Sequence, residues 1–200
     1  MRLVLLGDSI LDNRPYTEPE PDTTAHLQRL LGNGWIVERF ARDGAVMADV
    51  PHQVRAMAES PDVAVLSIGG NDAIEHIGLL ERHVTSAAVV FDELLQVADD
   101  FEARYEQAAR AVAAVARRTV LCAIYNVRLQ PAKYSRLVRV PIAVLNDRIL
   151  AVAARIGTDV LDLRTVCTDD ADFVLQIEPS AAGAEKIARA IAKMVEGGSS

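Results

Sequence analysis

Four short blocks of the chain combine glycine or proline with small polar and acidic side chains. They are Gly7-Asp8-Ser9-Ile10, Ala41-Arg42-Asp43-Gly44, Gly69-Gly70-Asn71-Asp72 and Glu178-Pro179-Ser180. Together they supply a serine hydroxyl, a side-chain amide and several carboxylates, which are groups that nucleophilic, acid–base or metal chemistry uses. Taken singly, each block is also an ordinary turn, because glycine, asparagine, aspartate and serine all favour turns. Their meaning therefore depends on whether the fold brings them together.

Short apolar runs determine where these blocks lie. Four such runs are Leu3–Leu6, Val63–Ile68, Val120–Tyr125 and Val160–Leu163. They are too short for helices and do not alternate with polar residues, so they predict strands buried on both faces of a parallel sheet. A more polar run, Trp35–Phe40, predicts a fifth strand nearer an edge. Ligands of an open parallel sheet bind beyond the carboxyl ends of its strands, which is where the blocks that follow the strands are expected.

Three apolar stripes at helical spacing predict the helices that cover the sheet. The first spans residues 101–115 and is expected to begin after Asp99-Asp100, whose charges suit a helix N-terminus. The second spans residues 142–156, and the third spans residues 187–195 with Ser180 as its N-cap. Alternating strands and helices predict an α/β fold, a three-layer α/β/α sandwich around a parallel sheet of about five strands. We expect one domain over residues 1–196 and a flexible tail over residues 197–200.

Composition and charge exclude several classes of protein. The chain has 200 residues, of which 50% are hydrophobic and 24% charged, so it can form a core without a metal or a disulfide. A net charge of −7 opposes binding to nucleic acid or to anionic lipid, and neither is expected as a partner. No stretch approaches the ~20 apolar residues of a membrane span. The N-terminal apolar run is too short for a signal peptide, so a cytoplasmic location is expected, although a chain whose export signal had been removed would look the same.

The order of the blocks resembles that of the GDSL, or SGNH, hydrolases. Gly-Asp-Ser-Ile directly follows the first predicted strand, a lone glycine (Gly44) follows the second, and Gly-Gly-Asn-Asp follows the third. A Pro-Ser pair then precedes the last helix, so the resemblance covers the whole chain. Members of this family are esterases and lipases with a flavodoxin-like three-layer fold. The resemblance therefore implies a hydrolase that cleaves a small-molecule carboxylic ester through an acyl-serine intermediate, with no cofactor and no metal.

The resemblance also implies roles for individual residues. Ser9 corresponds to the nucleophile, presented at the turn from strand to helix, where its backbone N–H and the helix N-terminus favour negative charge. The backbone N–H of Gly44 and the side-chain amide of Asn71 correspond to the other donors of an oxyanion hole, each worth about 3–4 kcal/mol in comparable sites. We interpret Asp8 as a turn-forming residue and Asp72 as a carboxylate in the first turn of a helix.

One family signature is missing. The expected Asp-x-x-His before the last helix is here Leu175-Gln176-Ile177-Glu178, so Glu178 occupies the histidine position. Three hypotheses follow. Glu178 is the base, with a pKa raised by burial; or His76, one helical turn after Asp72, replaces it; or the protein is catalytically silent and only binds an acylated or glycosidic ligand. In a purely structural role, Glu178 would cap the last helix or pair with Lys186 or Arg189.

Two further alternatives concern other polar residues. Four carboxylates could instead bind a metal ion, namely Asp8, Asp12, Asp72 and Glu178. The segment 126–140, which carries Arg128, Lys133, Arg136 and Arg139, is either a solvated loop or a pocket wall that attracts an anionic substrate. The remaining histidines, His26, His52 and His83, are expected at the surface.

Overall fold

A five-stranded, fully parallel sheet forms the centre of the protein. In the computed structural model, which describes residues 1–197, its strands are β1 (Arg2–Gly7), β2 (Ile36–Arg39), β3 (Val63–Ser67), β4 (Arg118–Ala123) and β5 (Asp159–Asp162). The spatial order is β2-β1-β3-β4-β5, which is the flavodoxin-like order. The predicted parallel sheet and fold class are confirmed, and the more polar strand β2 lies at an edge.

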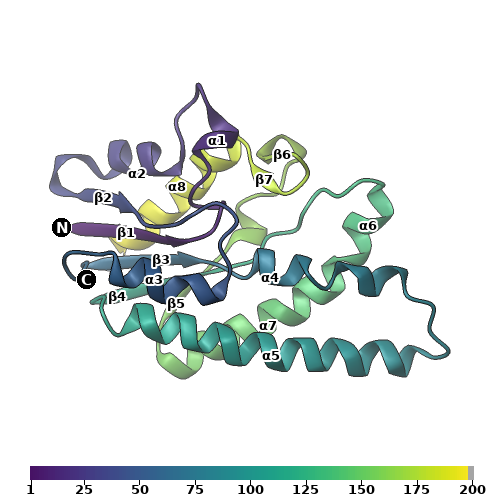
Figure 1. Ribbon diagram of the computed structural model, residues 1–200. Helices are drawn as coiled ribbons and strands as arrows, with labels where there is room; N and C mark the ends of the chain where they lie inside the picture. Colours follow the sequence, from purple (N-terminus) through teal and green to yellow (C-terminus); the bar gives the residue numbers. More distant parts are fainter. Residues whose placement is uncertain (198–200) are drawn as a thin grey trace.

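Helices cover both faces of the sheet (Figure 1). One layer consists of α1 (Arg14–Thr17), α2 (Thr23–Leu31) and α8 (Ala181–Gly197), and the other of α3 (Val50–Arg55), α5 (Ala87–Ala113) and α7 (Arg139–Ile156). Two short helices, α4 (Gly70–Ile74) and α6 (Ala132–Leu137), lie beyond the carboxyl ends of the strands. The small elements are η1 (Gly32–Gly34), η2 (Met47–Asp49), η3 (Ile77–Glu81), η4 (Leu163–Thr165), η5 (Asp170–Asp172), β6 (Phe173–Val174) and β7 (Glu178–Pro179).

Two hydrophobic cores, one on each face, hold the layers together. Because successive strand residues point to opposite faces, Val4 and Leu6 of β1 pack toward Tyr105 of α5, whereas Leu3 and Leu5 pack toward the α8 layer. All four β1 side chains are fully buried. This two-sided burial explains why the strands are continuous apolar runs.

Helix α5 is longer than the sequence indicated. The prediction that it begins after Asp99-Asp100 is wrong, because it begins at Ala87 and both aspartates lie in its middle. Asp99 pairs with Arg148 of α7 at 2.9 Å, and Asp100 pairs with Arg104 at 3.4 Å. These carboxylates therefore serve ion pairs on the exposed side of the helix rather than its N-terminus.

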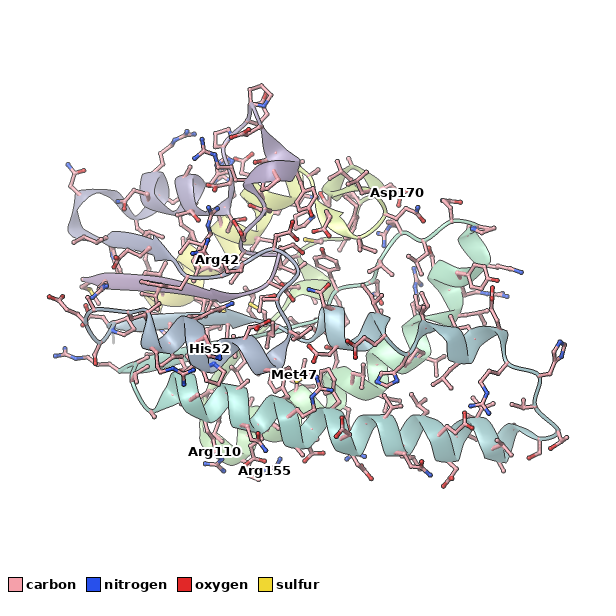
Figure 2. The ribbon with its side chains drawn as sticks, viewed as in Figure 1. Arg42, Met47, His52, Arg110, Arg155 and Asp170 are labelled. Atoms are coloured by element: carbon pink, nitrogen blue, oxygen red, sulfur yellow. The ribbon has the colours of Figure 1, made fainter. Side chains whose placement is uncertain are left out.

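Further ion pairs connect α5 with α7. Arg110 of α5 and Arg155 of α7 reach the same edge of this helix pair in Figure 2, and both contact Glu106, at 2.6 and 2.7 Å. Such exposed pairs contribute little individually, so the apolar contacts between the helices dominate.

The last helix begins as predicted. Ser180 Oγ accepts a hydrogen bond from the Gly183 N–H at 3.2 Å, which is the expected N-cap contact. Of the predicted tail, Gly197 is the last residue of α8, and residues 198–200 lie outside the part that the structure describes. No helix within residues 1–197 is long and apolar enough to cross a membrane.

Candidate active site

Ser9 lies just beyond the carboxyl end of β1, at the point where the strand order reverses. Gly7 ends the strand with φ +119°, and a Cβ at this position would lie 1.7 Å from the Ser67 carbonyl oxygen of β3. Only glycine fits this contact. The next residue, Asp8, donates its N–H to the same oxygen at 3.0 Å, which fixes the turn that carries Ser9. Ligands of flavodoxin-like sheets bind at this switch between β1 and β3.

The helix expected directly after Ser9 is absent from that position. Residues 9–12 form turns, and α1 begins only at Arg14. The expectation that a helix N-terminus stabilises negative charge at Ser9 is therefore wrong. Backbone N–H groups of the turn remain as the local donors.

Gly44 lies in the loop between β2 and α3, whose two sides are marked by Arg42 and Met47 in Figure 2. It adopts φ +76°, and no atom lies within 4 Å of the position that a Cβ would occupy. The Asn71 side-chain amide holds this loop by donating to the Ala45 carbonyl oxygen at 2.8 Å. An amide NH₂ has two hydrogens, so this bond leaves one of them for another acceptor. The structure thus brings Gly44 and Asn71 together.

Asp72 fixes the same loop from the neighbouring position. As predicted, it lies in the first turn of α4. Its carboxylate accepts the Met47 N–H at 3.1 Å and pairs with Arg104 of α5. Burial raises the pKa of Asp72, whereas the Met47 N–H and Arg104 lower it. Asp72 therefore acts on the architecture of the loop rather than on the cavity.

Three donors in the loops of Ser9, Gly44 and Asn71 are unengaged. Within residues 1–197, neither the backbone N–H of Ser9 nor that of Gly44 has an acceptor. Their neighbours do: the Ile10 N–H bonds to Asp8 at 3.2 Å, and the Ala45 N–H bonds to the Arg42 carbonyl at 3.1 Å. The second Asn71 amide hydrogen completes the set. Donors left without a protein partner at a ligand site are suited to bind an oxygen of the ligand.

Glu178 is carried by an antiparallel hairpin that the sequence did not indicate. Strands β6 and β7 pair Val174 with Glu178, and the intervening Leu175 and Gln176 have φ values of 48° and 73°. Leu175 is 73% exposed. The Gln176 carbonyl oxygen accepts the Arg128 N–H at 2.8 Å, which ties the hairpin loop to the segment after β4.

The Glu178 carboxyl is largely buried next to the Ser9 hydroxyl. Burial raises its pKa, and the Ser9 hydroxyl, as a hydrogen-bond donor, lowers it to a smaller extent. Glu178 Oε2 is buried and has no hydrogen-bond partner in the described part of the chain. Neither alternative ion pair is formed, because Lys186 binds acidic residues of the η5 region and Arg189 binds Glu185 at 2.6 Å. Glu178 is therefore left beside Ser9 with a free carboxylate oxygen.

Asp8 has a second property besides its predicted role in the turn. Its Oδ1 accepts the Ile10 N–H, as a turn-forming aspartate does. Burial raises its pKa to about 8, and the neighbouring charges of Glu178 and Asp72 add to this increase. Asp8 is therefore mainly protonated at neutral pH, so it adds little negative charge beneath Ser9.

Ser9, Asn71 and Glu178 meet at one cavity of about 420 Å³. Most of its wall is apolar, including Ile77, Leu94, Val97, Leu137, Ile142 and Leu145. His76 also lines the cavity, but it is exposed, and in the described structure no hydrogen bond joins its imidazole to Ser9. Gly44 is not part of the wall, and its loop is connected to it through the hydrogen bond from Asn71 to Ala45.

The segment 126–140 lines the cavity differently from the prediction. It contributes apolar side chains such as Val127, Leu129 and Val140, whereas none of its four basic residues forms part of the wall. Arg128 pairs instead with Asp170 at 2.6 Å. The segment is therefore a cavity wall made of apolar side chains, and its attraction of an anionic substrate stays a prediction without a basic wall residue to support it.

Two tyrosines near the site escaped the sequence analysis. The Tyr125 hydroxyl donates to the Ile177 carbonyl oxygen and so supports the residue before Glu178. The Tyr16 hydroxyl donates to Asp43 at 2.7 Å, next to Gly44. Neither tyrosine belongs to a motif, and only the position of Tyr125 at the end of a predicted strand could have indicated it.

Among residues 1–197, no three His, Cys, Asp or Glu side chains come together as metal ligands, so the alternative carboxylate site is not formed.

A flavodoxin-like sheet with a serine, backbone donors and an amide at its switch point defines a class of α/β hydrolase. The profile of the GDSL-like lipase/acylhydrolase family matches residues 5–186, and the chain belongs to this family of ester-bond hydrolases. A comparison with curated protein sequences gives no match.

Solved structures show the same fold. An extracellular lipase from Streptomyces rimosus superposes with a TM-score of 0.71 at 15% identity, over 98% of this chain and 99% of that one. Phospholipase A1 from Streptomyces albidoflavus gives 0.71 at 17% identity, over 98% of each chain. An acetylxylan esterase from Geobacillus stearothermophilus gives 0.69 at 18% identity, over 97% of this chain and 93% of that one.

Proposed function

We propose that Ser9 is the nucleophile of this ester hydrolase and that Glu178 is its general base. The observation that carries the proposal is that Ser9, the Asn71 amide and an unpartnered Glu178 oxygen share one cavity, with unengaged N–H groups at Ser9 and at Gly44 of the loop that Asn71 holds. A base must be ionised and within hydrogen-bond reach of the proton it accepts. Burial raises the pKa of Glu178, which makes its carboxylate a stronger base than a solvated one.

Acylation follows from this geometry. Glu178 takes the hydroxyl proton while Ser9 Oγ bonds to the ester carbonyl carbon, and the carbonyl electron pair moves onto its oxygen. The N–H groups of Ser9 and Gly44 and the Asn71 amide donate to that oxygen. When the tetrahedral intermediate collapses, the bond to the alcohol oxygen breaks, and the alcohol takes the proton from Glu178. The products of this step are the free alcohol and acyl-Ser9.

Deacylation repeats the sequence with water. Glu178, ionised again, takes a proton from a water molecule that attacks the acyl carbonyl carbon. The same three donors hold the oxyanion, Ser9 Oγ leaves and recovers the proton, and the carboxylic acid is released.

Hydrolysis of a p-nitrophenyl ester panel by wild type and Ser9→Ala tests the proposal. We expect turnover by the wild type, background rates from Ser9→Ala, and a mass increase of one acyl group on the Ser9 peptide after rapid acid quenching. Equal background rates from both proteins, with no acyl adduct, would instead favour the catalytically silent binding module. Full activity in Ser9→Ala would exclude Ser9 as the nucleophile.

A further inference from the structure

The wall of the cavity changes character with distance from Ser9. Near Ser9 it contains Asp8, Asn71 and Glu178, whereas the part contributed by η3, α5, α6 and α7 is aliphatic or aromatic, with the exposed His76 beside it. No lysine or arginine lines it in the described chain. A wall of this kind cannot pair with a sugar, a phosphate or a carboxylate, because their polar groups would lose water without gaining partners.

We infer that this cavity binds the acyl chain of the substrate and that the enzyme cleaves esters of medium- to long-chain aliphatic acids in preference to acetate. The inference rests on the proposed function, because it places the bound chain on acyl-Ser9. It assigns the substrate class that the catalytic residues alone leave open.

The surroundings of Glu178 indicate which half of the ester the cavity receives. Glu178 forms part of the cavity wall, and it also feels the charge of Asp43, which accepts the hydrogen bond from Tyr16. Neither Tyr16 nor Asp43 lines the cavity. Glu178 therefore lies between two regions: a polar region with Tyr16 and Asp43, and the apolar cavity. The alcohol must leave and water must arrive at the base, and both suit the polar side, which leaves the apolar side for the acyl chain.

The mouth of the cavity has apolar side chains that are partly open to solvent. Ile74, Ile77 and Leu137 are 43%, 43% and 41% exposed, and Phe91 of α5 is 60% exposed. All four belong to the cavity wall. Exposed apolar side chains that gather around one opening are characteristic of a ligand-binding groove. An aliphatic chain entering there would cover them.

A chain-length series measures this preference. Each methylene that is removed from water should raise kcat/KM by up to about fourfold. With p-nitrophenyl acetate, butyrate, octanoate and decanoate below their critical micelle concentrations, kcat/KM should rise steadily to octanoate or beyond. Acetate as the best substrate, or a flat series, would overturn the inference.

A matched pair of variants localises the effect. Leu94 lines the cavity, whereas its neighbour Leu95 is 52% exposed and does not. Leu94→Trp should reduce the decanoate-to-acetate ratio of kcat/KM at least about tenfold, because the indole fills space that the chain needs. Leu95→Trp should leave the ratio unchanged. Equal ratios in wild type and Leu94→Trp would contradict the assignment.

A binding measurement separates this inference from the proposed function. Methyl pyrenedecanoate, a neutral fluorescent ester, should bind Ser9→Ala with a fluorescence change that Leu94→Trp in the same background weakens. Such binding would support the cavity assignment even if no ester is turned over, and its absence would overturn it even if acetate is hydrolysed through Ser9. Dispersed monomeric esters and phosphatidylcholine vesicles, supplied separately, distinguish a soluble acyl ester from a membrane lipid as the source of the chain. Hydrolysis of neither by a protein that hydrolyses p-nitrophenyl acetate would contradict the preference for long acyl chains.

Discussion

Asp8 and Glu178 are two carboxyl groups on either side of Ser9 with different environments. Asp8 is fully buried and has a pKa raised to about 8, whereas Glu178 lies at the cavity, where burial raises its pKa and Ser9 partly offsets that increase. Two nearby carboxyl groups whose environments differ in this way can exist with one protonated and the other ionised. The pKa of Asp8, at about 8, makes Asp8 the protonated member at neutral pH. The proposed mechanism requires Glu178 to be the charged acceptor.

This assignment predicts the pH dependence of activity. Glu178 must lose its proton to act as a base, so kcat/KM for Ser9-dependent hydrolysis should rise with pH through one carboxyl pKa above the ordinary value of about 4.3. The profile should contain no limb that depends on histidine, and His76→Gln should leave it unchanged. A profile that shifts or disappears in His76→Gln would identify the imidazole as the base.

Asp8 predicts a separate effect on stability. Its folded-state pKa of about 8 exceeds the unfolded value of about 3.9, so the folded protein holds an extra proton between these values. The free energy of unfolding should therefore fall as pH rises through this range, by up to about 1.4 kcal/mol per pH unit. In Asp8→Asn the decline should be smaller and the stability at pH 8 higher than in the wild type. Urea unfolding between pH 5 and pH 8 measures this difference, and parallel curves would contradict it.

At the scale of elements, the contact between β1 and β3 determines where Ser9 lies. A Cβ on Gly7 would collide with the Ser67 carbonyl oxygen, which is backbone and cannot rotate away. Gly7→Ala should lower the free energy of unfolding by more than about 4 kcal/mol or prevent folding. Gly157 is the control: it also has a positive φ, of 71°, but open space around it, so Gly157→Ala should cost only about 1–2 kcal/mol. Similar losses in both variants, measured by urea unfolding, would show that the collision is relieved.

The elements also show which features can be predicted from the sequence. The five strands are recognisable because burial on both faces leaves continuous apolar runs such as Leu3–Leu6. The start of α5 is not recognisable, because two consecutive aspartates are typical of a helix N-terminus, whereas Asp99 and Asp100 form ion pairs in the middle of the helix. The hairpin β6–β7 is equally hidden, since its turn residue Leu175 is a residue type that rarely adopts a positive φ.

For the site, the motifs locate Ser9, Gly44 and Asn71 because glycine and small polar residues follow the strands in a fixed order. They do not reveal the cavity, whose wall comes from α4, η3, α5, α6 and α7 and forms only when these segments pack together. Apolar positions of α5 such as Val90, Leu94 and Val97 do continue the helical spacing toward the N-terminus. That periodicity predicts the helix, but it does not show that these side chains face a cavity.

At the scale of the whole molecule, the two halves of α5 have different surroundings: the second half packs in the core, and the first half forms part of the cavity wall. Its residues from Ala98 onward include six buried side chains, whereas none of the residues 87–97 is buried. In Figure 1 this first half extends beyond the sheet. Segments with few buried contacts open locally more often than the core.

Amide hydrogen exchange should reveal this division. We expect residues 87–97 to exchange at least about tenfold faster than residues 101–112, because the latter pack against the sheet. Methyl pyrenedecanoate bound to Ser9→Ala should slow exchange in the first half without changing the second. Uniform exchange along α5, or no change on binding, would contradict the proposed division of the helix.

The central claim is that Glu178 activates Ser9, and the activity of Glu178→Gln tests it most directly. Glutamine keeps the shape of the side chain but cannot accept the proton, so kcat/KM for the best p-nitrophenyl ester should fall by at least about 10²-fold with the circular dichroism spectrum unchanged. Glu178→His, combined with Leu175→Asp, should retain or restore activity. We predict that Glu178→Gln falls close to the rate of Ser9→Ala; a kcat/KM within twofold of the wild type would contradict the account.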